Sequence, residues 1–463
     1  MKIPFYIIPC LSRQEKSFDR RAKMNEANNI CVGVGKTDIT PPVGTELTGY
    51  GFYLNRNSRG IHLPSYSRVI LLRGENEEVL IFSNDLLDID EQIIRRSRAL
   101  IHSRLGISEN RIIFTSTHTH SGPATSFLRG VADISKEYTS SLPAKFLEAA
   151  IEAHSNLKRA SFGVGRKRIS GISYNRALKG GPIDGELMVI YFEDLRGKPI
   201  ATIFNFPCHP VTINVKTDAG YYISPDWPGC AMKIIGEKIG GISIFLQGAC
   251  GDINPLMKHK AKGFEVAEEI GRVIATETIS IVENLKLRER GQFGFGSSFV
   301  ELPTQPMDYK YVAEELSRFL REYERKRDSL PNGILRFYAE WSEDILRRMK
   351  RGLEKRMRSK IYAVRIGENA LSFLPGEVFV EIGLEIKRRS PFVNTMVIGY
   401  TDKCVGYIPA EWDFDLRGYA STMAPKVYDH PPYQKNVGRI LVNECLELLD
   451  CLKSSEPQAS EHY

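Results

Sequence analysis

The chain has 463 residues, of which 42% are hydrophobic and 26% are charged, and its formal net charge is +7. These proportions are typical of a soluble globular protein that buries a sizeable core. Lys and Arg are interleaved with Glu and Asp without a compact basic stripe, which argues against a nucleic-acid partner.

The first 29 residues are expected to form a loosely ordered extension. Their apolar run Phe5-Tyr6-Ile7-Ile8 is too short for a membrane span, and no small-residue cleavage site follows it. The eight cysteines are scattered without a CxxC pair, a pattern typical of buried thiols in a reducing compartment. We therefore expect a cytoplasmic protein without a transmembrane segment.

Apolar runs typical of strands recur along the chain, with stretches typical of helices between them. The predicted strands are 69–74, 79–85, 111–117, 200–207, 241–248, 370–376 and 394–401. The predicted helices are 90–104, 136–157, 228–239, 265–284, 310–324, 335–357, 378–388 and 436–452. This alternation predicts the α/β class, with mixed α+β sheets layered with helices in a single large domain.

The segment 310–360 differs from the rest of the chain because Arg, Lys and Glu crowd it. One interpretation is a pair of solvated helices hinged at Pro331-Asn332-Gly333. The other is a basic surface that contacts anionic lipid at the membrane periphery or another subunit. The sequence leaves both interpretations open, and with them the oligomeric state.

Several predicted strands end in polar side chains beside Gly or Pro. These side chains belong to His118 and His120, His209, Asp252 and Asn254, Glu377, and Tyr407. In open α/β sheets, ligands bind beyond the carboxyl ends of strands, where loops hold functional groups on a rigid base. If the strands are neighbours, these groups converge on one cleft.

Imidazoles, a carboxylate and a phenolate together are ligands that Zn²⁺ accepts while one position stays open for water. His118 and His120 are the strongest sign, because the alternation of a strand would send both imidazoles to one face. The other candidates also have structural interpretations. His209 could be a structural histidine, Glu377 the first-turn acid of the following helix, and Tyr407 a half-buried aromatic. The residue pattern by itself leaves the metal site open.

Two aspartates have competing interpretations. Asp252 either supports a metal-bound histidine or locks its own loop as an Asx-turn residue. Asp85, at the end of the strand predicted at 79–85, either lines the cleft or caps a helix.

Beyond single positions, the chain resembles the neutral (non-lysosomal) ceramidase family over roughly residues 30–450. The resemblance rests on VGVGKTDITPP (32–42), THTHSGPA (117–124), Asn175-Arg176, the His209 turn, SPDWPG (224–229), GDINP (251–255), LPGE (374–377), GYI (406–408) and AST (420–422). It implies one catalytic domain at 30–452, which contains the charged segment 310–360, followed by a tail at 453–463. Ceramidases continue into an immunoglobulin-like domain, which we do not expect in this chain.

The resemblance implies a zinc-dependent amidase. Carried over residue by residue, it places the zinc ligands on His118, His209, Glu377 and Tyr407, and it also counts Tyr407 among the catalytic groups. It places His120 and Arg176 against the substrate carbonyl or the developing oxyanion, where such groups stabilise acyl transfer.

The chain departs from the family at Asn254. Ceramidases carry a serine there, in a Gly-Asp-x-Ser-Pro loop, that is regarded as the nucleophile or as a key hydroxyl. An amide side chain donates and accepts hydrogen bonds but cannot form an acyl ester. We therefore expect metal-activated water to attack an acyl C–N bond directly, with Asn254 orienting the substrate or the water.

Three hypotheses about function follow. The first is an amidohydrolase of sphingolipid metabolism that acts on a small-molecule or lipid-like acyl substrate. The second is a metal-dependent esterase, lactonase or deacetylase that acts on a small polar or sugar-like substrate. The third is a family member that binds an acyl or glycan ligand without turnover, and Asn254 is its only support.

Overall fold

The structure is a computed structural model that describes residues 28–454, apart from 53–54, 257–262, 328–329 and 331–332. The predicted extension 1–29 lies outside the described residues except for its last two, which begin the first strand. The predicted tail 453–463 also lies outside them, except for its first two residues, which end the last helix. Residues 331–332 of the predicted hinge are outside them as well.

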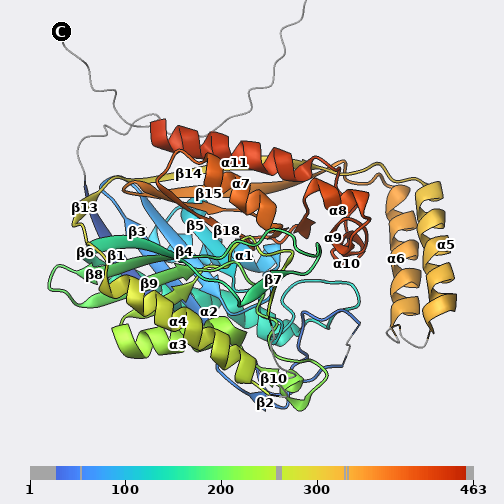
Figure 1. The fold of residues 1–463 in the computed structure, drawn as a ribbon, viewed down its shortest axis with the longest axis horizontal. Coiled ribbons are helices and arrows are strands. Elements are labelled where there is room, and N and C mark those ends of the chain that lie inside the picture. The colour runs from blue at the N-terminus through green and yellow to red at the C-terminus, as the bar shows by residue number, and fades with distance from the viewer. Residues whose placement is uncertain (1–27, 53–54, 257–262, 328–329, 331–332, 455–463) are drawn as a thin grey trace, which may run out of the picture.

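One large mixed sheet forms the centre of the protein (Figure 1). Its strands are β1 (Asn28–Asp38), β3 (Tyr66–Arg73), β4 (Glu78–Asn84), β5 (Ile112–Ser116), β6 (Lys158–Arg168), β8 (Glu186–Asp194), β9 (Pro199–Asn205), β11 (Ile242–Phe245) and β13 (Arg290–Gly291). Their order is β11-β9-β8-β6-β1-β3-β4-β5, and β13 pairs with β1. The pairs β4–β5 and β9–β11 are parallel.

Four helices cover one face of this sheet. They are α1 (Glu91–Leu105), α2 (Lys136–Ser155), α3 (Asp226–Ile239) and α4 (Glu265–Glu283). The helices α1 and α2 pack on β3, β4 and β5 through a buried cluster that includes Phe82, Phe114 and Phe146. The helices α3 and α4 pack on β8, β9 and β11 through a second cluster, which includes Phe204 and Trp227.

A second sheet covers the opposite face. It consists of β14 (Phe293–Pro303), β15 (Arg356–Ile366), β16 (Asn369–Phe373) and β18 (Asn394–Ile398), in that order. Its outer face is covered by α7 (Val380–Arg389) and α11 (Val437–Ser454). The protein is therefore layered as helices, large sheet, small sheet and helices, which confirms the predicted fold class (Figure 1).

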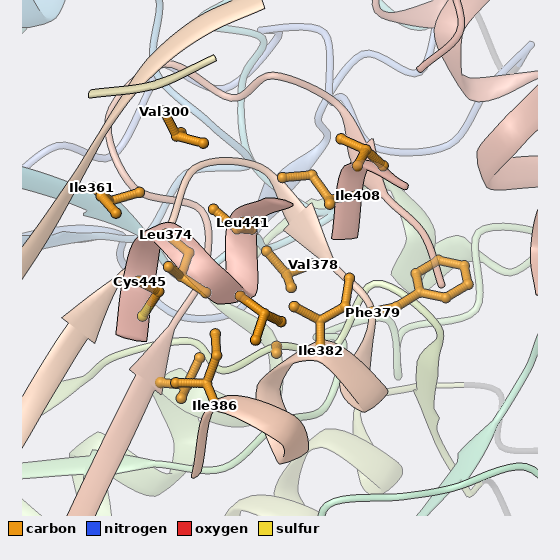
Figure 2. Close-up of a cluster of buried hydrophobic side chains, with 14 of the residues drawn as sticks. Val300, Ile361, Leu374, Val378, Phe379, Ile382, Ile386, Ile408, Leu441 and Cys445 are labelled. Carbon is orange, nitrogen blue, oxygen red and sulfur yellow. The ribbon is translucent and has the colours of Figure 1, made fainter. Parts of the chain in front are cut away.

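The core under α7 and α11 anchors two short strands that lead to the polar centre described below (Figure 2). These are β17 (Glu377–Val378) and β19 (Tyr407–Ile408), which pair in parallel with Glu377 opposite Tyr407. Val378 and Ile408 are completely buried in this core. Burying a side chain of this size stabilises the fold by about 1.5–3 kcal/mol. The two polar side chains are therefore held beside each other by the apolar residues that follow them.

The remaining elements are short. They are β2 (Gly60–Ile61), β10 (Tyr222–Ile223), β7 (Ser173–Asn175), β12 (Ile253–Pro255), α8 (Glu411–Asp415), α9 (Tyr419–Thr422), α10 (Ala424–Val427) and the 3-10 turns Glu109–Arg111 and Asp218–Tyr221. The strand β2 pairs with β10, and β7 pairs with β12.

The charged segment forms a helical hairpin of α5 (Tyr309–Lys326) and α6 (Ile334–Met349), which stands beside the layered body (Figure 1). Its inner face is apolar, and Phe337 of α6 packs edge-on against Phe52 at a centroid distance of 5.0 Å. Lys426 of α10 reaches the buried carboxylate of Glu315 in α5 at 3.0 Å. The predicted pair of helices is present, but the second helix ends at Met349 rather than at residue 357. The basic residues from 356 onward belong to β15.

Each predicted strand and helix has a counterpart, but five of the longest strands were not predicted: β1, β6, β8, β14 and β15. Three of them, β1, β6 and β14, contain a Gly-x-Gly pattern, which has a low strand propensity. In β1 tertiary packing requires the glycine, because a Cβ at Gly33 would lie 2.0 Å from the carbonyl oxygen of Ala153 in α2. Among the helices of the described part, none is both long enough and apolar enough to cross a bilayer.

Candidate metal centre

The polar residues selected from the sequence come together beyond the carboxyl ends of β4, β5, β9 and β11. The nitrogen atoms of His118, His120 and His209 that could bind a metal all lie within 4.8 Å of one another. All three side chains are buried, and their ring centroids are 5.0–5.8 Å apart. Residues separated by about 90 positions in the chain thus form one cluster.

The backbone orients the two histidines of the THTH segment in a way that differs from the prediction. The strand β5 ends at Ser116, so strand alternation does not orient His118 and His120. Instead His118 takes a left-handed backbone conformation, with φ 66°. Its backbone N–H donates to the carbonyl of Leu86, at 2.9 Å, in the loop that follows β4. A non-glycine residue in this conformation costs about 1–3 kcal/mol, and such residues cluster at functional sites.

Each of two histidines is oriented by a backbone carbonyl. The Nδ1 atom of His118 lies 2.8 Å from the carbonyl oxygen of Leu87, and Nδ1 of His209 lies 2.7 Å from that of Cys250. A carbonyl only accepts hydrogen bonds, so Nδ1 carries the proton in both rings. In the neutral imidazole the Nε2 atom then has a free lone pair. This is the arrangement in which histidines bind metals.

Both of these Nε2 atoms point at the same carboxylate oxygen. Glu377 Oε2 lies 3.3 Å from Nε2 of His118 and 3.2 Å from Nε2 of His209. Burial, followed by the charge of Arg176, lowers the pKa of His209 to about 4, which keeps this ring neutral near pH 7. Lone pairs therefore face one another across the centre, and a cation between them would relieve the repulsion. The donor set fits a divalent metal ion.

The carboxylate of Glu377 is itself held in place. Tyr428 donates a hydrogen bond of 2.6 Å to Oε1, which leaves Oε2 directed at the histidines. Burial raises the pKa of Glu377, whereas positive charge between the carboxylate and the two imidazoles, such as a proton on Nε2 of His118, lowers this pKa well below its usual range. The carboxylate is therefore ionised at neutral pH.

Tyr407 lies beside Glu377 because the strands β17 and β19 pair in register. Its hydroxyl oxygen accepts a hydrogen bond of 2.8 Å from Nη2 of Arg176. Burial raises the pKa of Tyr407 well above its usual range, whereas Arg176 lowers it. Glu377 also raises the pKa of Tyr407, so a phenol oxygen lies beside the donor set formed by the carboxylate and the imidazoles.

Arg176 connects the centre to Asn254. Its Nη2 atom also donates to the carbonyl of Gly251 at 2.8 Å, and its Nη1 atom lies 3.3 Å from Oδ1 of Asn254. Asn254 is partly exposed and lies in β12, opposite Tyr174 of β7. Arg176 follows β7 directly, so the pairing of these two short strands brings the guanidinium and the amide together.

His120 is enclosed by Gly49, Tyr50 and Arg56, none of which was predicted as a site residue. Neither of its ring nitrogens has a hydrogen-bond partner among the described residues, and burial lowers its pKa well below the usual value. Its ring packs against Tyr50 at a centroid distance of 5.0 Å. Arg56 donates to its backbone carbonyl at 2.6 Å. A Cβ at Gly49, where φ is +100°, would lie 2.5 Å from Cγ of His120.

The structure shows what the two aspartates contact. Asp252 accepts hydrogen bonds from Nδ2 of Asn175 at 2.6 Å and from the backbone of Val380 at 2.7 Å, so it ties its loop to the start of α7. This agrees with loop locking, although through distant partners rather than an Asx turn. Asp85 is buried in an ion pair of 2.7 Å with Arg68, and α1 is capped by Asp90 instead.

Other residues at the centre also went unrecognised in the sequence. Tyr428 contacts Glu377, Tyr400 packs against His118 at a centroid distance of 4.2 Å, and the 54%-exposed Tyr419 packs edge-on against Tyr407 at 5.7 Å. The only local signal for Tyr419 was its place beside the AST motif. Nothing in their local sequence distinguishes the other two from ordinary core aromatics.

Known proteins resemble this chain in sequence. Residues 30–262 match the model of a family described as neutral/alkaline non-lysosomal ceramidase, N-terminal. The chain is 24% identical over 306 residues to a neutral ceramidase of Pseudomonas aeruginosa, which covers 59% of this chain and 45% of the relative. It is 23% identical over 273 residues to neutral ceramidase A of Dictyostelium discoideum, which covers 52% of this chain and 38% of the relative. The matched region is therefore less than half of each relative.

The fold also matches solved structures. The crystal structure of neutral ceramidase from Pseudomonas aeruginosa aligns with a TM-score of 0.71 at 18% identity, covering 95% of this chain and 76% of that one. A ceramidase complexed with C2 aligns with a TM-score of 0.70 at 17% identity, covering 94% of this chain and 77% of that one. At such identities the likeness concerns the fold.

Proposed function

Because this chain belongs to the neutral/alkaline non-lysosomal ceramidase family, we propose that it is a zinc-dependent hydrolase that cleaves an acyl C–N bond. The observation that carries this proposal is the meeting of two carbonyl-oriented imidazoles and one carboxylate oxygen at a single buried point. An apolar core would not tolerate such a cluster of facing acceptors without a compensating cation.

The proposed metal ligands are His118, His209, Glu377 and Tyr407. Two imidazoles, a carboxylate and a phenol form a nitrogen and oxygen donor set that suits Zn²⁺. Bound there, zinc would lower the pKa of a water molecule towards neutrality and polarise a carbonyl group. The hydrogen bonds to the Leu87 and Cys250 carbonyls support this assignment because they leave Nε2 of both histidines available.

The groups beside the proposed ligands have complementary tasks. Arg176 is held by the Gly251 carbonyl and by Tyr407, so its positive charge is fixed next to the centre before substrate arrives. A fixed donor at a developing oxyanion contributes about 10²–10³ in kcat. The neutral ring of His120 has one N–H that can donate to an oxyanion and one lone pair that can accept a proton from water.

Asn254 occupies the place of the family's serine. Its Oδ1 atom accepts from Arg176, so its Nδ2 atom is left to donate to the substrate or to water. No acyl ester can form on an amide, and we propose direct attack by water without a covalent intermediate. The relatives are called neutral ceramidases, so a ceramide-type N-acyl lipid is the first substrate to test.

The proposal is tested by metal analysis and turnover on the same preparations. We expect roughly one zinc per chain in the purified wild type, and the loss of zinc in His118→Ala and in His209→Ala. Hydrolysis of fluorescent ceramide or of chromogenic acyl amides should stop on chelation and return with zinc. A folded wild type that contains only background zinc would refute the proposal. A zinc-loaded wild type that binds acyl amides without turning them over would make it a binding protein.

A further inference from the structure

A groove of about 910 Å³ lies far from the metal centre. It is formed where β16 and β18 begin, at Asn369 and Asn394, whereas the metal centre lies beyond the carboxyl ends of these strands. The other walls are β6, the end of α4 and the segment that leads into β13. None of the residues proposed for catalysis lines it. Its volume is within the range of ligand pockets, so it can hold a second binding partner.

One wall of this groove is an unpaired strand edge. The strand β6 pairs with β8 from Ala160 to Arg168, but on its other side it pairs with β1 only at Lys158–Ala160. Phe162 then exchanges two backbone hydrogen bonds of 2.8 and 2.9 Å with Arg288. Among the described residues no strand pairs with this side from 163 to 168. Alternate residues of a strand direct their N–H and C=O groups to the same side, so those of Val164 and Arg166 face the open edge.

The second wall is cationic. Lys286, Arg288 and Arg290 all line the groove, whereas Leu287 and Glu289 between them do not. Arg288 pairs with Phe162 and Arg290 pairs with Asn29 of β1, so these two cations lie at the closed end of the β6 edge, and Lys286 lies nearer its open part. Within the described part of the chain, none of the three has a carboxylate oxygen within 4.0 Å.

Among the described residues, Glu368 is the carboxylate that lines the groove, and its charge is shared among several cations. Glu368 lies 2.6 Å from Nζ of Lys453 and 3.7 Å from Nη2 of Arg365. Two further cations of the lining, Arg166 and Lys167, pair with acids on neighbouring elements. Lys453, Arg365 and, more weakly, Arg288 hold the pKa of Glu368 below its usual value, but the cations of the lining outnumber this acid and the groove keeps a net positive charge.

We propose that this groove binds an extended peptide segment of a partner protein, which carries acidic side chains at alternate positions and adds as a strand to β6. The open edge at 163–168 spans about 20 Å, the length of a strand of average size. An added strand would satisfy the backbone groups of Val164 and Arg166. Acidic side chains at the end of this strand would lie near Lys286 and Arg288, which line the groove beside the end of the open edge.

The test measures fluorescence anisotropy with a labelled peptide of sequence Glu-Val-Glu-Thr-Glu-Val on the full-length wild type. Two peptide controls accompany it. One has lysine in place of glutamate, and the other carries N-methyl groups on the alternate amides that would pair with β6. The protein variants are the pair Lys286→Glu and Arg288→Glu in the groove and, as a matched charge reversal elsewhere, Arg95→Glu with Arg96→Glu on the exposed face of α1. Melting temperatures verify that both variants fold.

We expect saturable binding by the wild type and by the α1 variant. The groove variant, the lysine peptide and the N-methylated peptide should each weaken binding at least about tenfold, because charge and backbone pairing are both required. The N-methylated peptide is tested on the wild type, so this result does not depend on how the groove variant folds.

Several outcomes would overturn the proposal. One is the absence of detectable binding at a protein concentration of about 1 mM, which corresponds to a binding free energy weaker than about 4.1 kcal/mol. Another is binding that survives both charge reversal in the groove and N-methylation. Groove-dependent sedimentation with phosphatidylglycerol vesicles, in the absence of peptide binding, would assign the groove to lipid. Groove-dependent self-association would assign it to a second copy. None of these results depends on whether the chain is a hydrolase.

Discussion

Replacing Tyr428 with phenylalanine tests the proposed metal centre most directly, because this change leaves all four proposed ligands in place. Tyr428, which is partly buried, donates a bond of 2.6 Å to Oε1 of the buried Glu377. This length is typical of a hydroxyl bound to an ionised carboxylate. The variant Tyr428→Phe would leave a buried, charged oxygen without this donor.

The magnitude follows from the charge of the acceptor. A hydrogen bond to a charged group contributes about 1.5–3 kcal/mol. At 1.36 kcal/mol per factor of ten, the loss corresponds to about 10- to 100-fold in zinc affinity, if the bond acts mainly on the metal-bound conformation. Removing the partners of metal ligands in other proteins costs a similar factor.

The assay is competition for zinc with a chromogenic chelator at pH 7, with the melting temperature measured in parallel. The matched control is Tyr433→Phe, because Tyr433 is also buried but donates its 2.7 Å bond to the carbonyl of Val405 rather than to a proposed ligand. We expect the control to lose some stability but to keep its zinc affinity. If folded Tyr428→Phe binds zinc within about twofold of the wild type, the reasoning about Glu377 is wrong.

Three further predictions concern the same centre. In Gly49→Ala, the new Cβ would lie 2.5 Å from Cγ of His120, so we expect kcat to fall about 100-fold while zinc content, measured on the same sample, is unchanged. The wild type should show no burst of product in stopped-flow experiments, because Asn254 cannot form an acyl ester, and a burst would contradict direct attack by water. Burial lowers the pKa of His209 below its unfolded value, and the imidazoles lower that of Glu377. The free energy of unfolding of the zinc-free protein, measured by urea titration, should therefore fall between pH 6.5 and 4, and His209→Gln should show a weaker fall.

The candidate site was predicted largely from residue types at strand ends and from the resemblance to a family. His118, His209, Glu377 and Tyr407 do lie together, as do His120, Arg176 and Asn254. Their roles in metal binding and catalysis stay predictions, as does the cytoplasmic location. The reason first given for the histidine pair was wrong, because a left-handed turn rather than strand alternation directs His118. Local periodicity cannot foresee a turn that a hydrogen bond from a distant loop stabilises.

The long strands show the same limit. Local propensity treats a Gly-x-Gly stretch as a poor strand, yet at Gly33 only a residue without a Cβ allows α2 to approach β1 closely. The local propensity of this segment disfavours a strand, whereas the packing of α2 on β1 requires glycine, and the packing determines the structure.

The amino-acid sequence by itself determined the alternation of helices and strands, the family, and the polar residues that follow the buried strands. The tertiary structure alone decided which atoms of those residues meet. It brought Tyr428 to Glu377, gave His209 its carbonyl partner at Cys250, and left one edge of β6 without a partner strand among the described residues. The physical reason is that hydrophobic periodicity is a local property, which any stable element must show. A hydrogen bond between residues 51 positions apart depends on how whole layers pack, and no single segment encodes that.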